Sequence, residues 1–168
     1  EINAGLVGSE MCIRDRTDAS RRAEVRGLCN EEAKALGLQP LGWRTVPVDP
    51  AVLGPLARAT APVIEQWVLN GDADDATFDG QLLRLRRRIG ARVRAALGAE
   101  VAQDVYVASL SSRTVVYKGM VRSEVLAQFY ADLQDPRFEV SFAVYHRRFS
   151  TNTLPRWPLA QPMRLLGH

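Results

Sequence analysis

The sequence predicts an α+β fold with a largely antiparallel sheet. Helical and strand-like hydrophobic patterns follow one another without the regular strand–helix–strand alternation of a parallel sheet. The chain has 168 residues, of which 46% are hydrophobic and 24% are charged, so one ordinary domain with a sizeable core is expected. This composition excludes a disordered or collagen-like chain. No apolar run reaches the roughly 18 to 20 residues that cross a bilayer, so we expect no membrane partner.

Residues 1–16, EINAGLVGSEMCIRDR, stand apart from the rest of the chain because they keep neither a helical nor a strand period. They also lack the basic start and apolar centre of a secretory signal. The run VGSEMCIRDR resembles a translated sequencing-adapter tail, which is found fused to broken ends of unrelated sequences. We therefore interpret 1–16 as a non-native tail outside the fold and 17–168 as the domain. A flexible native N-terminus is the alternative.

A helix is predicted to begin near Thr17, with Asp18 or Ser20 as its N-cap, and to end at Gly37 in a left-handed cap. Its apolar residues form one stripe: Val25, Leu28, Cys29, Ala33 and Leu36. The position of Cys29 within the stripe indicates a small buried hydrophobe and not a reactive thiol.

Two strands and a connecting turn are predicted next. Residues 41–48 alternate until Pro47 interrupts them, which indicates an edge strand. Residues 50–61 are rich in Pro and Gly and are typical of a turn. Residues 62–70 carry apolar side chains on both faces, so we expect this second strand to be covered on both sides.

The clearest helix is predicted over 75–97, after an acidic loop that suits a helix N-terminus. Its apolar residues share one stripe: Phe78, Leu82, Leu85, Ile89, Val93 and Ala96. The opposite side carries rows of arginine: Arg84, Arg88 and Arg92 in one, Arg87 and Arg94 in another. The net charge is only +3 and no aromatic residues interleave, so we favour a solvated face near a subunit or domain boundary over nucleic-acid binding.

Beyond residue 104 the pattern becomes richer in strands. Runs at 105–110 and 114–118 fit a hairpin or one bent strand, and 123–133 is predicted as a short amphipathic helix. Residues 138–144 alternate apolar and polar side chains, which predicts a strand that leads to His146, Arg147 and Arg148. The Pro-rich end of the chain is expected to be ordered around Trp157.

The polar residues support one candidate site better than others. Ser111 or Ser112 with His146 could be imagined as a catalytic set, but the Gly-x-Ser-x-Gly motif is absent. No Cys-x-x-Cys or paired-His spacing predicts a metal site, and two cysteines indicate a reducing compartment, with the cytoplasm as the default. Arg148, Thr151 and Asn152 follow a predicted strand and combine a carboxylate-binding fork with hydroxyl and amide groups. They could form an amino-acid pocket.

Several long stretches carry a more specific signal: residues 41–66, SLSSRTVVYKGM at 109–120, the element at 129–133 and DPRFEVSFAVYHRRFSTNTLPRWPLAQPMRLLGH at 135–168. Together they closely resemble the glutamine amidotransferase domain of the glutamate synthase large subunit. The resemblance covers essentially all of 17–168 in collinear order.

This resemblance implies an N-terminal nucleophile fold, a four-layer αββα sandwich. It also implies that an N-terminal Cys, with its α-amino group as base, attacks the side-chain amide of L-glutamine and forms a thioester that water hydrolyses. The ammonia passes to a second domain that converts 2-oxoglutarate to glutamate with FMN and an iron–sulfur cluster. NADPH or ferredoxin supplies the electrons, and a small reductase subunit is a possible partner beside the remaining domains of the large subunit.

Three residues fall on the pocket of the family: Arg148 on the arginine that holds the glutamine α-carboxylate, and Thr151 and Asn152 on the adjoining wall. Arg147 departs from the small residue expected there. Cys12 and Cys29 are internal and lack a free α-amino group, and the oxyanion-hole Asn-Gly pair would follow His168.

The family pattern therefore leads us to expect an incomplete sandwich without catalytic residues or cofactors of its own, inactive alone. The alternative is a non-catalytic amino-acid-binding or interaction module that docks through the arginines at 84–94.

Overall fold

A four-stranded sheet with two helices makes up the first of two units in this computed structural model, which describes residues 7–13, 19–71, 74–147 and 154–160. The first unit comprises Glu1–Thr45 and Pro62–Val116, and the second comprises Val46–Ala61 and Tyr117–His168. Helices and strands are mixed, as the sequence predicts for an α+β chain.

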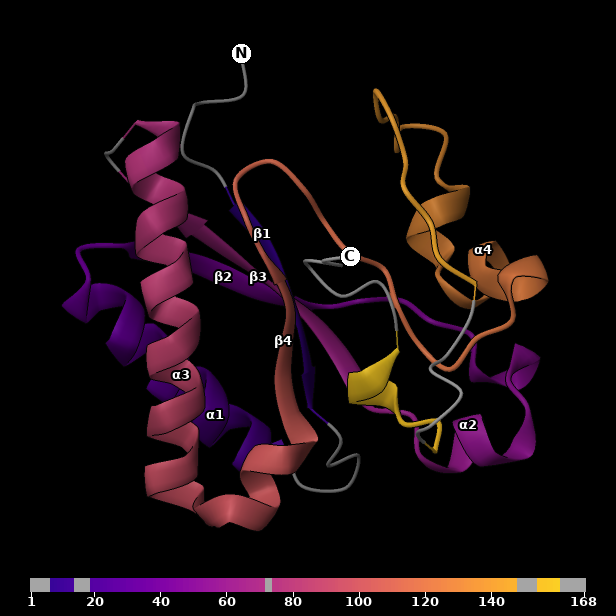
Figure 1. Cartoon of the computed structure of the whole chain (residues 1–168), viewed down its shortest axis with the longest axis horizontal. Coiled ribbons are helices and arrows are strands. Elements are labelled where there is room, and N and C mark those ends of the chain that lie inside the picture. Colours follow the sequence, from indigo (N-terminus) through magenta and orange to yellow (C-terminus); the bar gives the residue numbers. More distant parts are fainter. Residues whose placement is uncertain (1–6, 14–18, 72–73, 148–153, 161–168) are drawn as a thin grey trace, which may run out of the picture. The chain divides into compact units, whose positions relative to one another are not determined.

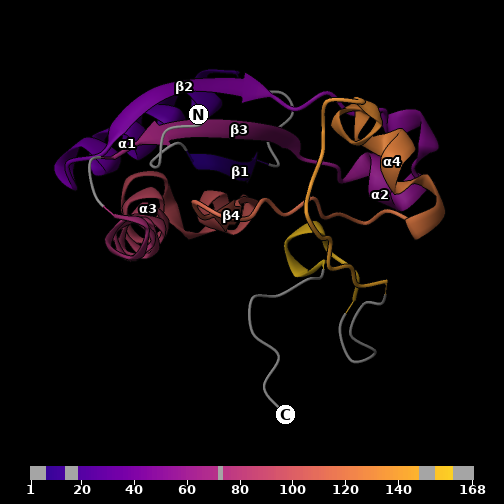
Figure 2. The same ribbon diagram turned by 90° about the horizontal axis from the view of Figure 1, so that it is seen from above.

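The sheet of the first unit is antiparallel throughout. Its strands are β1 (Val7–Ile13), β2 (Gln39–Thr45), β3 (Val63–Asn70) and β4 (Val105–Leu110). They lie in the order β2-β3-β1-β4, which Figure 2 shows from one edge to the other. Strand β2 is therefore an edge strand, as Pro47 and the alternating pattern predict. Strand β3 has buried residues on both faces, which confirms the second prediction for this region.

Strand β1 differs from the expectation that residues 1–16 contribute nothing to the fold. Val7–Ile13 pair with β3, in the register Cys12 to Ile64, and with β4, in the register Cys12 to Tyr106. Backbone N–H and C=O groups are the same in every residue, so this pairing needs no hydrophobic period from the strand itself. Because such pairing is independent of sequence origin, the foreign origin of 1–16 stays a prediction.

Helix α1 (Ala19–Ala35) follows its predicted stripe, with Val25, Cys29 and Ala33 buried. It ends as predicted at Gly37, which has a positive φ of 74°. The N–H of Leu38 donates to the carbonyl of Ala33, and the N–H of Gly37 donates to that of Lys34. These two bonds satisfy carbonyls that the end of a helix otherwise leaves unpaired, so glycine is suited to this position.

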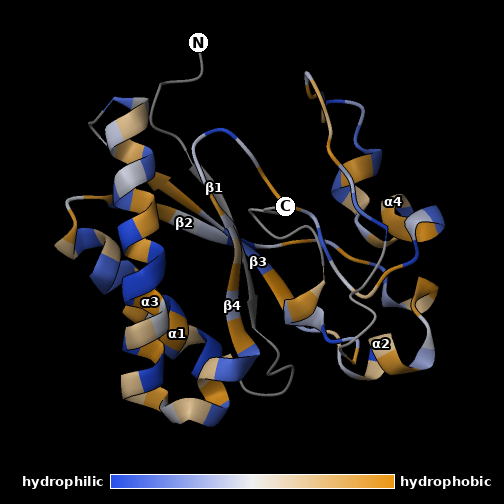
Figure 3. Cartoon of the chain, viewed as in Figure 1, coloured by the Kyte–Doolittle hydropathy of each residue, from blue (hydrophilic) through white to orange (hydrophobic). Residues whose placement is uncertain are grey.

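Helix α3 (Asp75–Asp104) begins at Asp74, whose carboxylate accepts from the backbone N–H of Ala76 and Thr77. The helix continues past the predicted end at residue 97 through a kink at Gly98, where φ is 85°. Five residues of the predicted stripe are buried: Phe78, Leu82, Leu85, Ile89 and Val93. Ala96 is exposed, and Leu97 packs on the core in its place. Figure 3 shows the resulting bands of hydrophobic and hydrophilic residues along α3.

The core of the first unit lies between these helices and the sheet. It joins the stripes of α1 and α3 to Trp67 and Leu69 of β3 and Val107 of β4. Figure 1 shows α1 and α3 side by side. The rings of Trp43 and Trp67 stack with their centroids 4.9 Å apart, which ties the edge strand β2 to its neighbour.

The second unit is built from short helical turns. They are Pro50–Val52, α2 (Pro55–Ala59), Ser123–Val125, α4 (Leu126–Phe129), Ala131–Gln134 and Trp157–Leu159. The predicted turn at 50–61 thus contains a short helix, and the predicted helix at 123–133 is broken into three pieces. Val48 and Tyr130 form an isolated antiparallel bridge. Segments this short hold too few turns for a hydrophobic period to identify them.

Two predicted strands do not form. Residues 114–118 are irregular, which excludes the predicted hairpin or bent strand, and so are residues 138–144. The alternating side chains of the latter are exposed: 59% for Val140, 73% for Phe142 and 81% for Val144. A strand needs a partner for its backbone groups, and residues 138–144 have no paired strand within the described part of the chain.

Among the described residues, no helix is both long enough and apolar enough to span a membrane.

Candidate functional site

The three residues predicted to bind an amino acid, Arg148, Thr151 and Asn152, lie outside the described residues. The structure describes the chain up to Arg147 on one side and from Leu154 on the other, both within the second unit. The candidate site is therefore built from the contacts that fix these two flanks.

The N-terminal flank is exposed. Nη2 of Arg147 lies 3.1 Å from Oε1 of Glu124, and both side chains are more than half exposed. The pKa of Glu124 is lowered first by a hydrogen bond from its own backbone N–H, then by the Ser123 hydroxyl, and to a smaller extent by the charge of Arg147. Exposed pairs of this kind contribute little to stability. Arg147 thus has a local carboxylate partner.

The C-terminal flank is exposed at 154–156 and is held at Trp157, around which the sequence predicts order. Trp157 is 2% exposed, and its Nε1 donates to the carbonyl oxygen of Ala57 over 3.1 Å. Its ring also contacts Phe129, with the ring centroids 5.8 Å apart. Trp157 therefore holds the turn Trp157–Leu159 against α2 and α4.

Lys118 is a buried polar residue that the sequence analysis missed. Its Nζ donates to the carbonyl oxygens of Pro158, at 3.1 Å, and Ala160, at 3.0 Å. Its own carbonyl accepts from the Tyr130 hydroxyl at 2.8 Å. Lysine is rarely buried unless it is hydrogen-bonded. A lysine within the apolar run VVYKGM was the available signal, but its partners lie 40 and 42 residues further along the chain.

A pocket of about 290 Å³ lies beside α2, lined by residues 52–57 and 120–122. The lining is mostly aliphatic, with Leu53 and Met120 among its residues and Arg122 as its charged residue. Such a surface suits an apolar group better than the polar ends of an amino acid.

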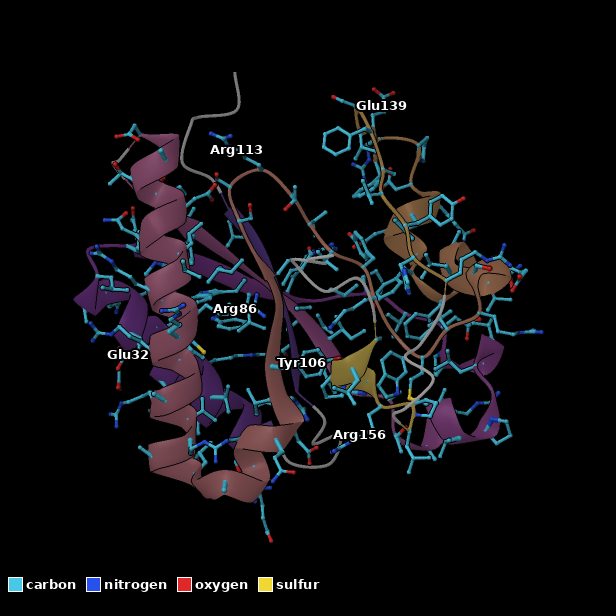
Figure 4. All side chains as sticks on the ribbon, in the orientation of Figure 1. Glu32, Arg86, Tyr106, Arg113, Glu139 and Arg156 are labelled. Carbon is cyan, nitrogen blue, oxygen red and sulfur yellow. The ribbon has the colours of Figure 1, made fainter. Side chains whose placement is uncertain are left out.

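The serines considered as nucleophiles hold local structure. The backbone N–H and the hydroxyl of Ser112 both donate to Oδ1 of Asp79, at 3.0 and 2.9 Å. The hydroxyl of Ser111 accepts from the backbone N–H of Arg113. Figure 4 labels Arg113 on the loop that follows β4. Each serine thus fixes the end of β4.

Cys29 is a buried thiol, as predicted. It is 1% exposed, and its pKa is raised to about 12, first by burial and then by the negative charges of Glu32 and Glu65. A thiol in this state is protonated at neutral pH, whereas a nucleophile must be a thiolate. Cys12 lies within β1 at an internal position of the chain, so its nitrogen is part of a peptide bond.

Part of the arginine-rich side of α3 is paired with α1. Nε of Arg88 lies 2.6 Å from Oε2 of Glu32, and Arg92 lies 3.6 Å from both Glu31 and Glu32. Figure 4 labels Glu32 on α1 beside α3. Three further arginines are exposed, as predicted for a solvated face: Arg84, Arg87 and Arg94.

Within the described ranges, no group of three or more His, Cys, Asp or Glu side chains is arranged to hold a metal ion.

Comparison with known proteins identifies similar sequences over nearly the whole chain. The sequence model of the family described as "Glutamine amidotransferases class-II" matches residues 4–168. The chain is 51% identical over 148 residues to the chloroplastic ferredoxin-dependent glutamate synthase of Oryza sativa subsp. japonica. These aligned residues are 82% of this chain and 9% of that protein. It is 49% identical over 154 residues to ferredoxin-dependent glutamate synthase 2 of Synechocystis, covering 90% and 9% of the two chains.

A third relative is matched over almost every residue. The glutamate synthase [NADPH] large chain of Azospirillum brasilense is 46% identical over 168 residues, which are 99% of this chain and 11% of that protein. The chain therefore spans about a tenth of the length of the curated relatives that it matches.

Proposed function

Since this chain belongs to the class-II glutamine amidotransferases, we propose that it is part of the glutaminase domain of a glutamate synthase and contributes the glutamine-binding pocket. The observation that carries the proposal is the similarity to proteins of that name. Identities of 45 to 53% extend over 76 to 99% of the chain. The described residues of both units fall within the matched residues.

The proposed reaction is the hydrolysis of L-glutamine to glutamate and ammonia. A thiolate attacks the side-chain amide carbon, and the nitrogen leaves as ammonia after it takes up a proton. Water then cleaves the resulting thioester. We propose that the whole protein channels this ammonia to a second site. There the ammonia and 2-oxoglutarate form glutamate, with two electrons from NADPH or ferredoxin. This chain contributes substrate binding to that sequence.

Arg148, Thr151 and Asn152 are proposed to hold the substrate. A guanidinium presents two parallel N–H donors that match a carboxylate, so Arg148 would bind the α-carboxylate of glutamine. The hydroxyl of Thr151 and the amide of Asn152 would complete the wall beside it. The buried side chain of Trp157 supports this assignment, because it fixes the chain shortly after these residues.

The attacking thiol is proposed to belong to neither cysteine of this chain. Cys29 is buried and protonated, and the nitrogen of Cys12 is part of a peptide bond, so it cannot serve as the base. By resemblance to the family, an N-terminal Cys supplies thiolate and base together, and an Asn-Gly pair supplies the oxyanion hole. We therefore propose that this chain alone binds glutamine without hydrolysing it.

The cofactors of the proposed parent enzyme do not fit this chain. An iron–sulfur cluster is usually held by about four cysteine thiolates, and the sequence has two cysteines. We assign the cluster and FMN to the remaining domains of the large subunit, and we assign electron delivery to a small reductase subunit or to ferredoxin. For location we propose a reducing compartment such as the cytoplasm, in keeping with the free thiol of Cys29.

The complete domain is proposed to be an αββα sandwich, in which residues 138–144 form a strand of a second sheet. The alternation of apolar side chains in this segment, and their exposure in the structure, support that proposal. Its partner strands would come from outside the described residues.

The second candidate is a non-catalytic amino-acid-binding module. The observation that favours it is that the thiol of Cys29 is protonated at neutral pH. The two candidates differ in whether bound glutamine is consumed. The test uses the full-length protein that contains this chain, incubated with glutamine labelled with ¹⁵N in its side-chain amide. We expect labelled ammonia to be released.

The matched variant is Cys29→Ser. It should release ammonia at a rate within about threefold of the wild-type rate, because a buried thiol does not take part in the reaction. Glutamine binding without ammonia release would favour the non-catalytic module. A folded Cys29→Ser protein without activity would overturn the assignment of the nucleophile.

A further inference from the structure

Helix α3 carries an excess of positive charge along its middle part. Residues 80–99 contain six arginines and no acidic residue. In Figure 2, which shows α3 almost end-on, one side of the helix faces α1 and β4, and the other faces away from them. Two of the arginines, Arg88 and Arg92, pair with Glu31 and Glu32 of α1. The charges on the outer side of α3 need a separate explanation.

A row of outward-facing residues runs along α3: Leu83, Arg87, Gly90 and Arg94. Successive spacings of 4, 3 and 4 residues place them on one side of the helix, over a length of about 16 Å. Leu83 is 50% exposed, and the other three are exposed as well. Arg87 and Arg94 have no ion-pair partner within the described part of the chain. We call these four residues the α3 row.

Gly90 destabilises the helix and has no evident use inside the first unit. A glycine within a helix is less favourable than an alanine, because it loses more backbone freedom on folding. The φ of Gly90 is not positive, and an added Cβ would meet no atom within 4 Å. An alanine would therefore suit the chain alone better. What glycine does provide is room for another element to approach the helix closely from outside.

The arginines of the row also fit a partner better than they fit the chain alone. Arg84 lies one turn before Arg87 on the same exposed side, and like charges at this spacing destabilise a helix. A carboxylate beside them would remove that repulsion. A guanidinium binds a carboxylate through two parallel N–H donors, so arginine suits such a contact better than lysine does. The row is therefore complementary in charge to an acidic partner.

The geometry of the row indicates what kind of element fits it. Arg87 and Arg94 are seven residues apart, which is two helical turns or about 10.5 Å along the axis. Two helices that cross at about 20° stay in contact over such a length, and small side chains at the contact bring their axes to about 8 Å. A helix along the row would thus lay its backbone against Gly90 and place carboxylates seven residues apart against the two arginines.

A partner from the same protein is favoured by the length of the relatives. This chain spans about a tenth of their length, so most of the proposed large subunit lies outside the structure. A domain that is tethered to this one has an effective concentration in the millimolar range. Two ion pairs and one close helix contact then suffice for docking, whereas a free partner needs a larger interface.

We propose that the α3 row is the docking surface for a helix that carries two carboxylates seven residues apart and belongs to another domain of the same large subunit. The origin of this helix rests on the proposed function. The proposal gives a role to arginines that neither the substrate pocket nor the nucleophile uses. It also makes Gly90 the position where the two helices come closest.

The test is zero-length cross-linking in the full-length protein. A carbodiimide joins an amine to a carboxylate only where the two are in direct contact, so lysine replaces arginine in the variants Arg87→Lys and Arg94→Lys. We expect each variant to cross-link to an acidic residue of another domain, and the two acidic residues to be seven positions apart. The matched control Arg92→Lys should cross-link to Glu31 or Glu32, because Arg92 lies 3.6 Å from both.

A substitution at Gly90 tests the close approach of the partner helix. Gly90→Leu together with Arg94→Lys should lower the cross-link yield at least about fivefold, because the leucine side chain keeps the partner away. Gly90→Leu together with Arg92→Lys should keep its cross-link to α1, which shows that the first unit is folded. The melting temperature should not fall, since leucine favours a helix more than glycine does and the site is open.

Three outcomes would overturn the proposal. If position 92 cross-links to α1 while positions 87 and 94 form no cross-link, the row is a solvated face. Cross-links between two copies, identified by mixing unlabelled and ¹⁵N-labelled protein, would assign the row to a subunit interface. Duplex DNA that binds the wild type and not the double variant Arg87→Glu with Arg94→Glu would assign it to nucleic acid. None of these measurements uses glutamine, so the release of labelled ammonia tests the proposed function separately.

Discussion

Glu65 is a fully buried carboxylate in the centre of the first unit, and its charge is paired with Arg26. Nε of Arg26 donates to Oε2 of Glu65 at 3.0 Å, and Nη2 donates to Oε1. The Arg26 guanidinium also lies over the Trp43 ring, 5.9 Å from its centroid. The hydrogen bond to Glu65 is the largest cause of the raised pKa of Arg26. The pair thus links α1 to β2 and β3.

We predict that Arg26→Ala lowers the free energy of unfolding by about 2 to 3 kcal/mol, because it leaves the Glu65 charge buried and unpaired. This loss is just below the loss of unfolding free energy that is typical when one partner of a fully buried ion pair is removed. It is smaller here because about a third of the Arg26 side chain faces solvent. Urea denaturation measures the change. The double variant Arg26→Met with Glu65→Leu should recover most of it, because a well-packed apolar pair needs no charge partner.

The exposed Arg44→Ala variant is the matched control, since Arg44 lies on the edge strand β2 and bonds Gln66 of the neighbouring strand β3. It should cost less than about 0.5 kcal/mol. An Arg26→Ala protein as stable as the Arg44→Ala protein would show that the buried carboxylate tolerates the loss of its partner.

At the scale of elements, residues 138–145 form the segment that differs most from its predicted structure. Backbone N–H groups of Phe138 and Glu139 donate to nearby turn carbonyls, whereas residues 140–145 make no backbone hydrogen bond within the described part of the chain. The apolar side chains of this segment are exposed. A segment with strand propensity and no partner is poised to pair with another strand.

Hydrogen exchange tests this interpretation directly. Amides of 140–145 should exchange rapidly in this chain alone and become protected by a factor of about 100 or more in the full-length protein, where partner strands are proposed. Amides of β3, which is paired on both sides, should be protected in both and serve as the internal control. Equal exchange of 140–145 in the two proteins would contradict the second sheet.

The elements that the sequence predicts well are those that carry their own evidence. Helix α3 repeats its apolar stripe over many turns, and α1 ends at a glycine whose left-handed conformation few other residues adopt. The edge position of β2 follows from Pro47. In each case the signal lies within the element or two residues beyond its end, so no knowledge of distant residues is needed.

The features that the sequence did not predict depend on distant partners. Strand β1 exists because β3 and β4 pair with it on both sides, although its own sequence keeps no period. Residues 138–144 show the opposite case, with a strand pattern and no partner. At the candidate site, the order around Trp157 could be predicted from its apolar flanks. The burial of Lys118 could not, because its carbonyl partners are 40 and 42 residues away.

At the scale of the whole molecule, the two units contribute different properties. The first holds a sheet, two long helices and the hydrophobic core. The second holds short helical turns, among them Trp157–Leu159, and both flanks of the residues proposed to bind glutamine. We infer that stability depends chiefly on the first unit and substrate recognition on the second.

We propose that Arg148 binds the α-carboxylate of glutamine. A thermodynamic cycle tests it most directly: L-glutamine and its α-amide, which lacks the carboxylate, are titrated by calorimetry into the full-length wild-type protein and into Arg148→Gln and Arg147→Gln variants. We expect the wild type and Arg147→Gln to prefer glutamine over the amide by about tenfold or more, as a charge-assisted hydrogen bond provides. Arg148→Gln should bind both ligands equally weakly. If Arg148→Gln keeps the wild-type preference, the carboxylate is bound elsewhere and the claim is wrong.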